Sequence, residues 1–188
     1  MSSSLDDLQQ LQQLLADRSA RRGKFTLSSG RESTLYIDAR LTTMSPEGLV
    51  LIGRLGLDSL HQHGWDVQAI GGLTLGADPV AFAVAYTSAD TTRPLRAFTV
   101  RKEPKGHGAG RLVEGPVTSG DRVVIVEDVI TTGASALRAV SAIRAMGGTV
   151  VGVLAVVDRE EGGREALEAE GLPVVALTTA TQITSRMS

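Results

Sequence analysis

Short apolar runs alternate with helix-length segments from residue 67 onward, and this alternation restricts the fold more than any other feature of the chain. Each run is of strand length, and most are rich in β-branched residues. The runs lie at residues 67–70, 95–100, 122–126, 150–157 and 173–177, and the helical segments at 77–86, 134–146 and 164–169. Because strands that alternate with helices form a parallel sheet covered on both faces, we predict a doubly wound α/β fold with a mostly parallel sheet and flanking helices.

The N-terminal part of the chain follows a different pattern. Leucines at helical spacing predict a first helix that ends near Ala20, and Ser45-Pro46 predicts the start of a second helix. Between the two helices lie two short strand-like pieces at 24–27 and 35–37. After the first apolar run of the sheet, the pair Gly71-Gly72 predicts a turn.

Composition limits both the organisation of the chain and the classes of partner. No linker, repeat or low-complexity tract is visible, so we predict a single domain over residues 1–188 with a small N-terminal segment of about 1–45. The chain has no cysteine, which excludes disulfides and thiolate metal sites. No signal peptide pattern or membrane-length apolar stretch is present, so we expect a cytoplasmic protein. A net charge of −2 and 3% aromatic residues argue against a nucleic-acid partner.

The segment at 123–135 carries the most specific chemical pattern. An apolar strand leads into the adjacent carboxylates Glu127 and Asp128, and a turn rich in Thr, Gly and Ser then opens a helix. In a doubly wound sheet, ligands bind at the carboxyl ends of the strands, where backbone N–H groups at a helix start attract an anion. The alternative is a purely structural turn whose hydroxyl groups only cap the helix. Two carboxylates at the end of a buried strand favour a binding site.

A second pattern is a cluster of positive charge in the glycine-rich segment at 101–111. Glycines at 106, 108 and 110 disfavour regular structure, so we predict a mobile lid that closes over a polyanion. A solvated charged loop is the alternative that charge alone would allow. The basic residues in and near the segment are Arg96, Arg101, Lys102, Lys105, His107 and Arg111.

The segment at 123–135 resembles the phosphoribosyl pyrophosphate (PRPP) motif of type I phosphoribosyltransferases. The resemblance implies the fold of that family with a small N-terminal hood. It also implies that Glu127 and Asp128 hold the ribose hydroxyls and that the turn holds the 5′-phosphate. The PRPP-binding residues implied in all are Arg101, Lys102, Lys105, His107, Glu127, Asp128, Val129, Ile130, Thr131, Thr132, Gly133, Ala134 and Ser135.

Other segments narrow the resemblance to orotate phosphoribosyltransferases. The pattern Arg-Lys-x-x-Lys-x-His-Gly at 101–108 resembles their catalytic loop, which implies a homodimer in which the loop reaches the neighbour's pyrophosphate. Segments 25–38 and 71–79 resemble the orotate-side segment and the pyrophosphate loop. Asp158-Arg159 resembles the position whose arginine meets the orotate carboxylate. Many members carry lysine where this chain has Ser28, and also in the pyrophosphate loop at 73–76, which has no cation here.

The resemblance implies a Mg²⁺-dependent transfer of the 5-phosphoribosyl group from PRPP to orotate. The products would be orotidine 5′-monophosphate and pyrophosphate, as in de novo pyrimidine biosynthesis. It assigns catalysis to Lys105, His107 and Asp128, and orotate binding to Thr131 and Arg159. It also implies that the Mg²⁺ ion is held mainly by PRPP rather than by the protein. Two alternatives remain: a phosphoribosyltransferase for another base, and a non-catalytic regulator that senses PRPP. A base without a carboxylate would give Arg159 no partner, and a regulator would have no need of the basic lid.

Overall fold

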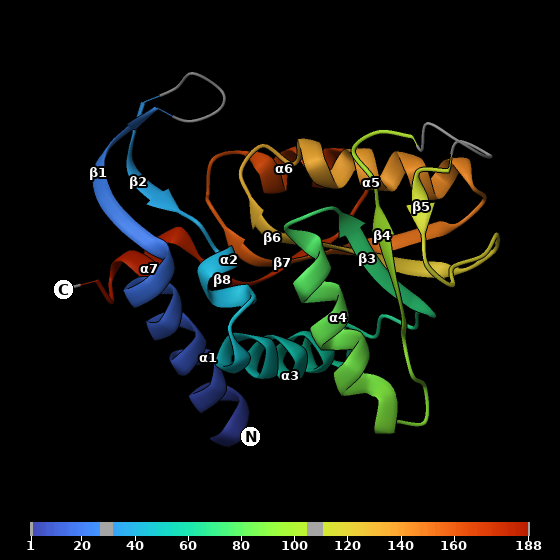
Figure 1. Ribbon diagram of the computed structural model, residues 1–188, viewed down its shortest axis with the longest axis horizontal. Coiled ribbons are helices and arrows are strands. Elements are labelled where there is room, and N and C mark those ends of the chain that lie inside the picture. The colour runs from blue at the N-terminus through green and yellow to red at the C-terminus, as the bar shows by residue number, and fades with distance from the viewer. Residues whose placement is uncertain (1, 27–31, 105–110, 188) are drawn as a thin grey trace.

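A six-stranded sheet with helices on both faces forms the centre of the molecule (Figure 1). The computed structural model describes residues 2–26, 32–104 and 111–187. The strand order is β5-β4-β3-β6-β7-β8, and every neighbouring pair is parallel except β4 and β5. The strands are β3 (Ala69–Leu73), β4 (Arg96–Val100), β5 (Val113–Glu114), β6 (Arg122–Ile130), β7 (Thr149–Asp158) and β8 (Val174–Thr179). The predicted doubly wound, mostly parallel sheet is confirmed.

Alternating side chains along the strands build a separate core on each face of the sheet. In β6, Val124 and Val126 pack on one face, and Val123 and Ile125 pack on the other. The first face is covered by α3 (Pro46–Gln62) and α4 (Ala77–Thr87), and the second by α5 (Ala134–Ala145) and α6 (Gly163–Ala169) (Figure 1). None of the helices in the described part of the chain has both the length and the apolar character needed to cross a membrane.

The N-terminal segment packs beside the sheet and carries its own two-stranded hairpin. It comprises α1 (Ser2–Leu14), a π-helical turn (Leu15–Ser19), β1 (Ala20–Thr26), β2 (Glu32–Ile37) and α2 (Arg40–Thr43). Gln12 Nε2 donates to Thr178 Oγ1 at 3.1 Å and so ties α1 to β8. The chain ends in α7 (Ala180–Thr184), which also packs against α1. Figure 1 shows the hairpin projecting away from the helical layer toward the side of the sheet where β6 and β7 end.

Two local predictions are wrong. Gly71 and Gly72 lie inside β3 rather than in a turn, because glycine is needed there for close packing. A Cβ would stand 2.1 Å from the Phe98 carbonyl oxygen at the first position and 2.2 Å from that of Val126 at the second. Strand β6 also continues to Ile130 instead of ending at Val126, so the acidic pair belongs to the strand itself.

Candidate active site

A cavity of about 680 Å³ opens where β3, β6 and β7 end, the edge at which a parallel sheet places its ligands. Segments from five parts of the chain meet there: the end of β2, the β3–α4 loop, the start of the predicted lid, the turn after β6 and the turn after β7. The lining residues are Tyr36, Ile37, Asp38, Ala39, Arg40, Leu73, Thr74, Leu75, Gly76, Lys102, Arg159 and all of 127–136. The structure therefore brings most of the predicted site residues together on one cavity.

The turn from Thr131 to Ser135 leads from the end of β6 into α5. Gly133 has φ 78°, and a Cβ there would lie 2.9 Å from the Gly163 carbonyl oxygen, so both conformation and space require glycine. Thr132 Oγ1 accepts a hydrogen bond of 3.4 Å from the N–H of Ala134, the first residue of the helix. The turn thus presents the positive end of the α5 dipole to the cavity, which suits a phosphate group.

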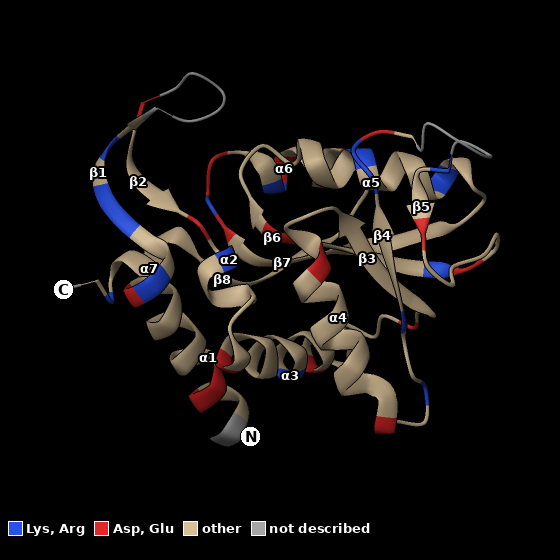
Figure 2. Cartoon of the chain, viewed as in Figure 1, with Lys and Arg blue, Asp and Glu red and all other residues tan. Residues whose placement is uncertain are grey.

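The acidic pair lies on the cavity wall beside the β3–α4 loop. Glu127 is 6% exposed, and its Oε1 has no hydrogen-bond partner among the residues that the structure describes. Asp128 Oδ1 accepts from the N–H of Val129 at 2.9 Å. A Cβ added to Gly76 would stand 2.5 Å from the same oxygen, so a side chain at this position would have to displace the carboxylate. Figure 2 shows the acidic ends of β6 and α4 next to each other.

Burial changes the ionisation of both carboxyl groups. Burial, and then the charge of Asp128, raise the pKa of Glu127 to about 8. Burial is also the main cause that raises the pKa of Asp128. At neutral pH the free protein therefore holds Glu127 largely protonated. A neutral carboxyl group with an unpartnered oxygen is suited to exchange hydrogen bonds with sugar hydroxyls.

The raised pKa of Glu127 predicts a specific loss of stability toward alkaline pH. The folded-state pKa lies above the unfolded value, so the stabilisation is complete below about pH 4.5 and is lost as pH rises to about 8. A Glu127→Gln variant cannot ionise. We expect its free energy of unfolding to fall less than that of the wild type between pH 5 and pH 8.5, by an amount on the order of several kcal/mol.

Urea unfolding at the two pH values measures this difference. Glu103→Gln serves as the control, because it makes the same chemical change at an exposed position. If the free energy of unfolding fell equally in the wild type and in Glu127→Gln, the fold would not raise the pKa of Glu127.

The β3–α4 loop is held by hydrogen bonds that converge on one carboxylate. Asp78 accepts from Thr74 Oγ1 at 2.7 Å and from Thr99 Oγ1 at 2.9 Å, so the loop is tied both to α4 and to β4. The peptide bond between Thr74 and Leu75 is cis. The loop supplies no cation, as its sequence predicted.

A cation that sequence reasoning missed lies on another part of the cavity wall. Arg40, the first residue of α2, donates from Nε to Asp38 Oδ1 at 2.8 Å and from Nη2 to Oδ2 at 2.9 Å. This partner lowers the pKa of the Asp38 carboxyl group. The Arg40 guanidinium also interacts electrostatically with Asp128. The signal in the sequence was its place two residues after Asp38, at the end of the orotate-side segment.

The first residues of the segment predicted to form a lid are placed, whereas 105–110 lie outside the described residues. Lys102 lines the cavity, and its carbonyl oxygen accepts from Arg138 Nη2 at 2.6 Å. Arg101 stands apart from the lining residues, with its Nη1 3.7 Å from Glu114 Oε1. The predicted residues Lys105 and His107 belong to the segment 105–110, which the structure does not describe, and Ser28 lies in the other such segment.

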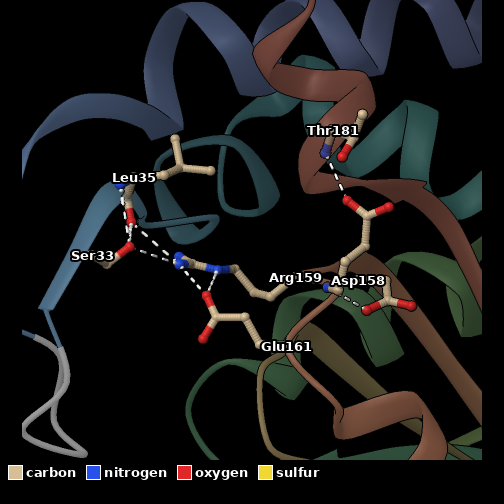
Figure 3. Close-up of polar contacts among 7 residues, drawn as sticks. Ser33, Leu35, Asp158, Arg159, Glu161 and Thr181 are labelled. Atoms are coloured by element: carbon tan, nitrogen blue, oxygen red, sulfur yellow. Dashed lines mark hydrogen bonds and ion pairs between the residues drawn. The ribbon is translucent and has the colours of Figure 1, made fainter.

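Arg159 brings a nearly buried positive charge to the cavity wall. It follows β7, and its N–H donates to the Ile130 carbonyl oxygen at 2.9 Å, which places it beside Thr131. Its guanidinium donates to Glu161 Oε1 from Nε at 3.0 Å and from Nη2 at 2.6 Å. Figure 3 shows it held between this carboxylate and the β2 residues Ser33 and Leu35. A cation so placed suits an anionic group of a ligand.

Comparison with known proteins agrees with this site. A family model described as "Phosphoribosyl transferase domain" matches residues 80–170. The chain is 52% identical over 153 residues to an orotate phosphoribosyltransferase of Aquifex aeolicus, covering 81% of this chain and 82% of the relative. The crystal structure of Mycobacterium tuberculosis H37Rv orotate phosphoribosyltransferase with Fe(III) dicitrate has a TM-score of 0.83 at 46% identity, covering 94% and 98% of the two chains. The structure of that enzyme with PRPP has a TM-score of 0.78 at 44% identity, covering 95% and 99%.

Proposed function

The chain belongs to the orotate phosphoribosyltransferases, and from this premise we propose that it transfers the 5-phosphoribosyl group of PRPP to orotate with Mg²⁺. The products are orotidine 5′-monophosphate and pyrophosphate, a step of pyrimidine biosynthesis. One observation carries the proposal: the buried cation Arg159 shares a cavity with the turn 131–135 and the acidic pair. The cavity thus offers separate places for a carboxylated base, a sugar and a phosphate. The related M. tuberculosis enzyme has been crystallised with PRPP.

Different residues of the cavity bind different parts of the substrates. The turn 131–135 holds the 5′-phosphate, Glu127 and Asp128 exchange hydrogen bonds with the ribose hydroxyls, and Arg159 with Thr131 binds orotate. A ring nitrogen of orotate gives up its proton and forms a bond to the anomeric carbon, while the bond between that carbon and the pyrophosphate oxygen breaks. Positive charge develops on the sugar in the transition state and negative charge on the leaving group.

The lid cations neutralise the leaving pyrophosphate, which is where the protein contributes most to the reaction. Lys102 already lines the cavity, and we propose that Arg101, Lys105 and His107 join it when the lid closes. Closure also excludes water, which would otherwise take the ribosyl group. Lys105 and His107 are the two candidates to give a proton to the departing oxygen.

The donor set of the cavity fits a magnesium ion that the substrate largely holds. Among the described residues, no group of three or more His, Asp or Glu side chains could hold a metal. Two adjacent carboxylates nevertheless lie on the cavity wall, and Mg²⁺ in phosphate sites commonly takes one or two carboxylates together with substrate phosphates and water. Glu127 and Asp128 are the residues that would approach it. Bound Mg²⁺ would supply positive charge for the pyrophosphate.

A pyrophosphate-release assay with PRPP and a panel of bases tests the proposal. We expect release with orotate and little with uracil, hypoxanthine or nicotinate. We expect Arg159→Ala to lower the affinity for orotate about 10- to 150-fold, because the orotate carboxylate loses a charged hydrogen-bond partner. The KM for PRPP should change little. Activity with another base would favour the alternative phosphoribosyltransferase, and no activity with any base would favour a PRPP-sensing regulator. An unchanged orotate KM in Arg159→Ala would remove Arg159 from the base site.

We further propose that the protein is a homodimer whose active sites are shared. An apolar surface that includes the β3–α4 loop and the outer side of α4 supports this. Leu75, Phe82 and Tyr86 are 53%, 52% and 84% exposed, and the two aromatic residues lie one helical turn apart on α4. Large exposed apolar side chains in one region commonly mark a protein interface. Leu75 also lines the cavity, so a partner on this surface would lie at the edge of the site.

A further inference from the structure

The guanidinium of Arg159 is held along one edge, at Nε and Nη2, by contacts within the protein. Its side chain is 5% exposed. Glu161 Oε1 accepts from Nε and Nη2, while Nη2 also donates to the Leu35 carbonyl oxygen at 3.2 Å and to Ser33 Oγ at 3.4 Å (Figure 3). Among the described residues, Nη1 has no hydrogen-bond partner. The contacts therefore fix one edge of the guanidinium and leave the remaining nitrogen for a ligand.

Glu161 acts on Arg159 from outside the cavity. Arg159 belongs to the described residues that line the cavity, whereas Glu161, Ser33 and Leu35 do not. A carboxylate that competed with a ligand for Arg159 would have to lie in the ligand's space. Because Glu161 is not among the lining residues, its bonds to Nε and Nη2 can persist while the cavity is filled.

The turn after β7 directs Glu161 to this place. Asp158 Oδ1 accepts from the N–H of Glu160 at 2.8 Å and so tightens the turn. Glu160 has φ 58°, and its carboxylate accepts from the N–H of Thr181 at 2.9 Å. Gly162 follows with φ 91°. Two adjacent glutamates thus have different partners, and only Glu161 contacts the guanidinium.

We propose that Glu161 is a positioning residue that sets the specificity of the base site. It orients Arg159 so that Nη1 meets the carboxylate of the incoming base, and it thereby favours a carboxylated pyrimidine over uracil. Orientation of a charged donor in advance lowers the cost of binding, because fewer side-chain conformations are lost when the ligand arrives. The inference rests on the proposed orotate phosphoribosyltransferase activity and assigns a further residue to it.

Steady-state kinetics of Glu161→Gln test the proposal, with Glu160→Gln as the matched control. The two variants carry the same chemical change at adjacent positions, but only the first weakens the bonds to Arg159. We expect Glu161→Gln to raise the KM for orotate about tenfold, with the KM for PRPP and the kcat near wild type. The preference for orotate over uracil should fall to a similar extent. Glu161→Asp, which keeps the charge, should recover part of the loss, and Glu160→Gln should match the wild type.

Several results would overturn the proposal while leaving the proposed function intact. A lower orotate KM in Glu161→Gln would make Glu161 a competitor of the substrate. Equal increases in both KM values with a lower melting temperature would make it a general structural residue, as would failure of both Glu161 variants to fold. Identical kinetics in Glu161→Gln and Glu160→Gln would remove any special role. A wild-type protein without activity on orotate would instead refute the proposed function itself.

Discussion

An Asp128→Asn chain is expected to lose about 100- to 1000-fold in kcat/KM while folding normally, because the change removes a charge from the cavity wall that we propose faces the reacting sugar. The carboxylate lies at the cavity rather than in either core, and its Oδ1 bond to the N–H of Val129 is available to the amide oxygen of asparagine. The raised pKa of Asp128 shows that its charge is held at a cost to the fold. Neutralising it should therefore leave the melting temperature equal to or above that of the wild type.

Rates of pyrophosphate release, measured beside thermal unfolding, separate the two effects. Asp90→Asn provides the control, since Asp90 is exposed and lies outside the residues that line the cavity. Wild-type kcat/KM in Asp128→Asn would show that this carboxylate takes no part in the reaction. A large fall in melting temperature would place its role in folding.

Mixing two inactive chains, Lys105→Ala and Asp128→Asn, should restore about a quarter of the wild-type activity. In a random mixture about half of the dimers combine one chain of each kind. If the lid of one chain completes the site of the other, each mixed dimer has one intact site and one site with both defects. The prediction rests on the family resemblance of the loop and on the exposed apolar side chains near the cavity, because Lys105 itself lies outside the described residues.

Subunit exchange must be shown independently, for example with chains that carry different tags. A mixture of Lys105→Ala with unmutated but tagged chains should keep about half of the wild-type activity in either case, and so tests whether subunit exchange itself harms the active sites. If exchange is complete and the two inactive chains stay inactive together, each lid serves its own site and Lys105 acts within its own chain.

The sequence predicted the sheet well because the evidence for each strand is local. β-branched runs such as 122–126 and 150–157 form strands wherever they can be buried, and Gly133 marks the start of α5. The glycine pair in β3 was misjudged because its requirement is tertiary: Phe98 and Val126 approach it from other strands. The extension of β6 through Glu127 was missed for a related reason, since only pairing with β7 keeps this polar stretch extended.

The site was predictable where a motif is continuous in the sequence and not where distant segments meet. The turn 131–135 and Arg159 both lie on the cavity, as expected. Arg40 was missed because the end of β2 approaches β6 only in the folded chain. The contact of Glu161 with Arg159 was missed because Glu160 and Glu161 are adjacent, and the sequence does not show which of them meets the guanidinium. In both cases the decisive information is which partner an ionised side chain finds, and residue spacing does not contain it.

The contact between Gly133 and Gly163 has a consequence for how the cavity can evolve. A Cβ on Gly163 would stand 2.6 Å from the Thr131 carbonyl oxygen and 2.9 Å from the Gly133 nitrogen, so the phosphate turn and the start of α6 leave no space between them. Each position constrains the other, and neither can accept a side chain unless the backbone of both shifts. Substitutions should therefore be rare at the phosphate turn and at the start of α6, and more frequent at the open rim of the cavity formed by β2 and α2. New base preferences in a chain of this kind would arise by changing the rim together with Arg159 and Glu161, while the phosphate end of the substrate remains in place.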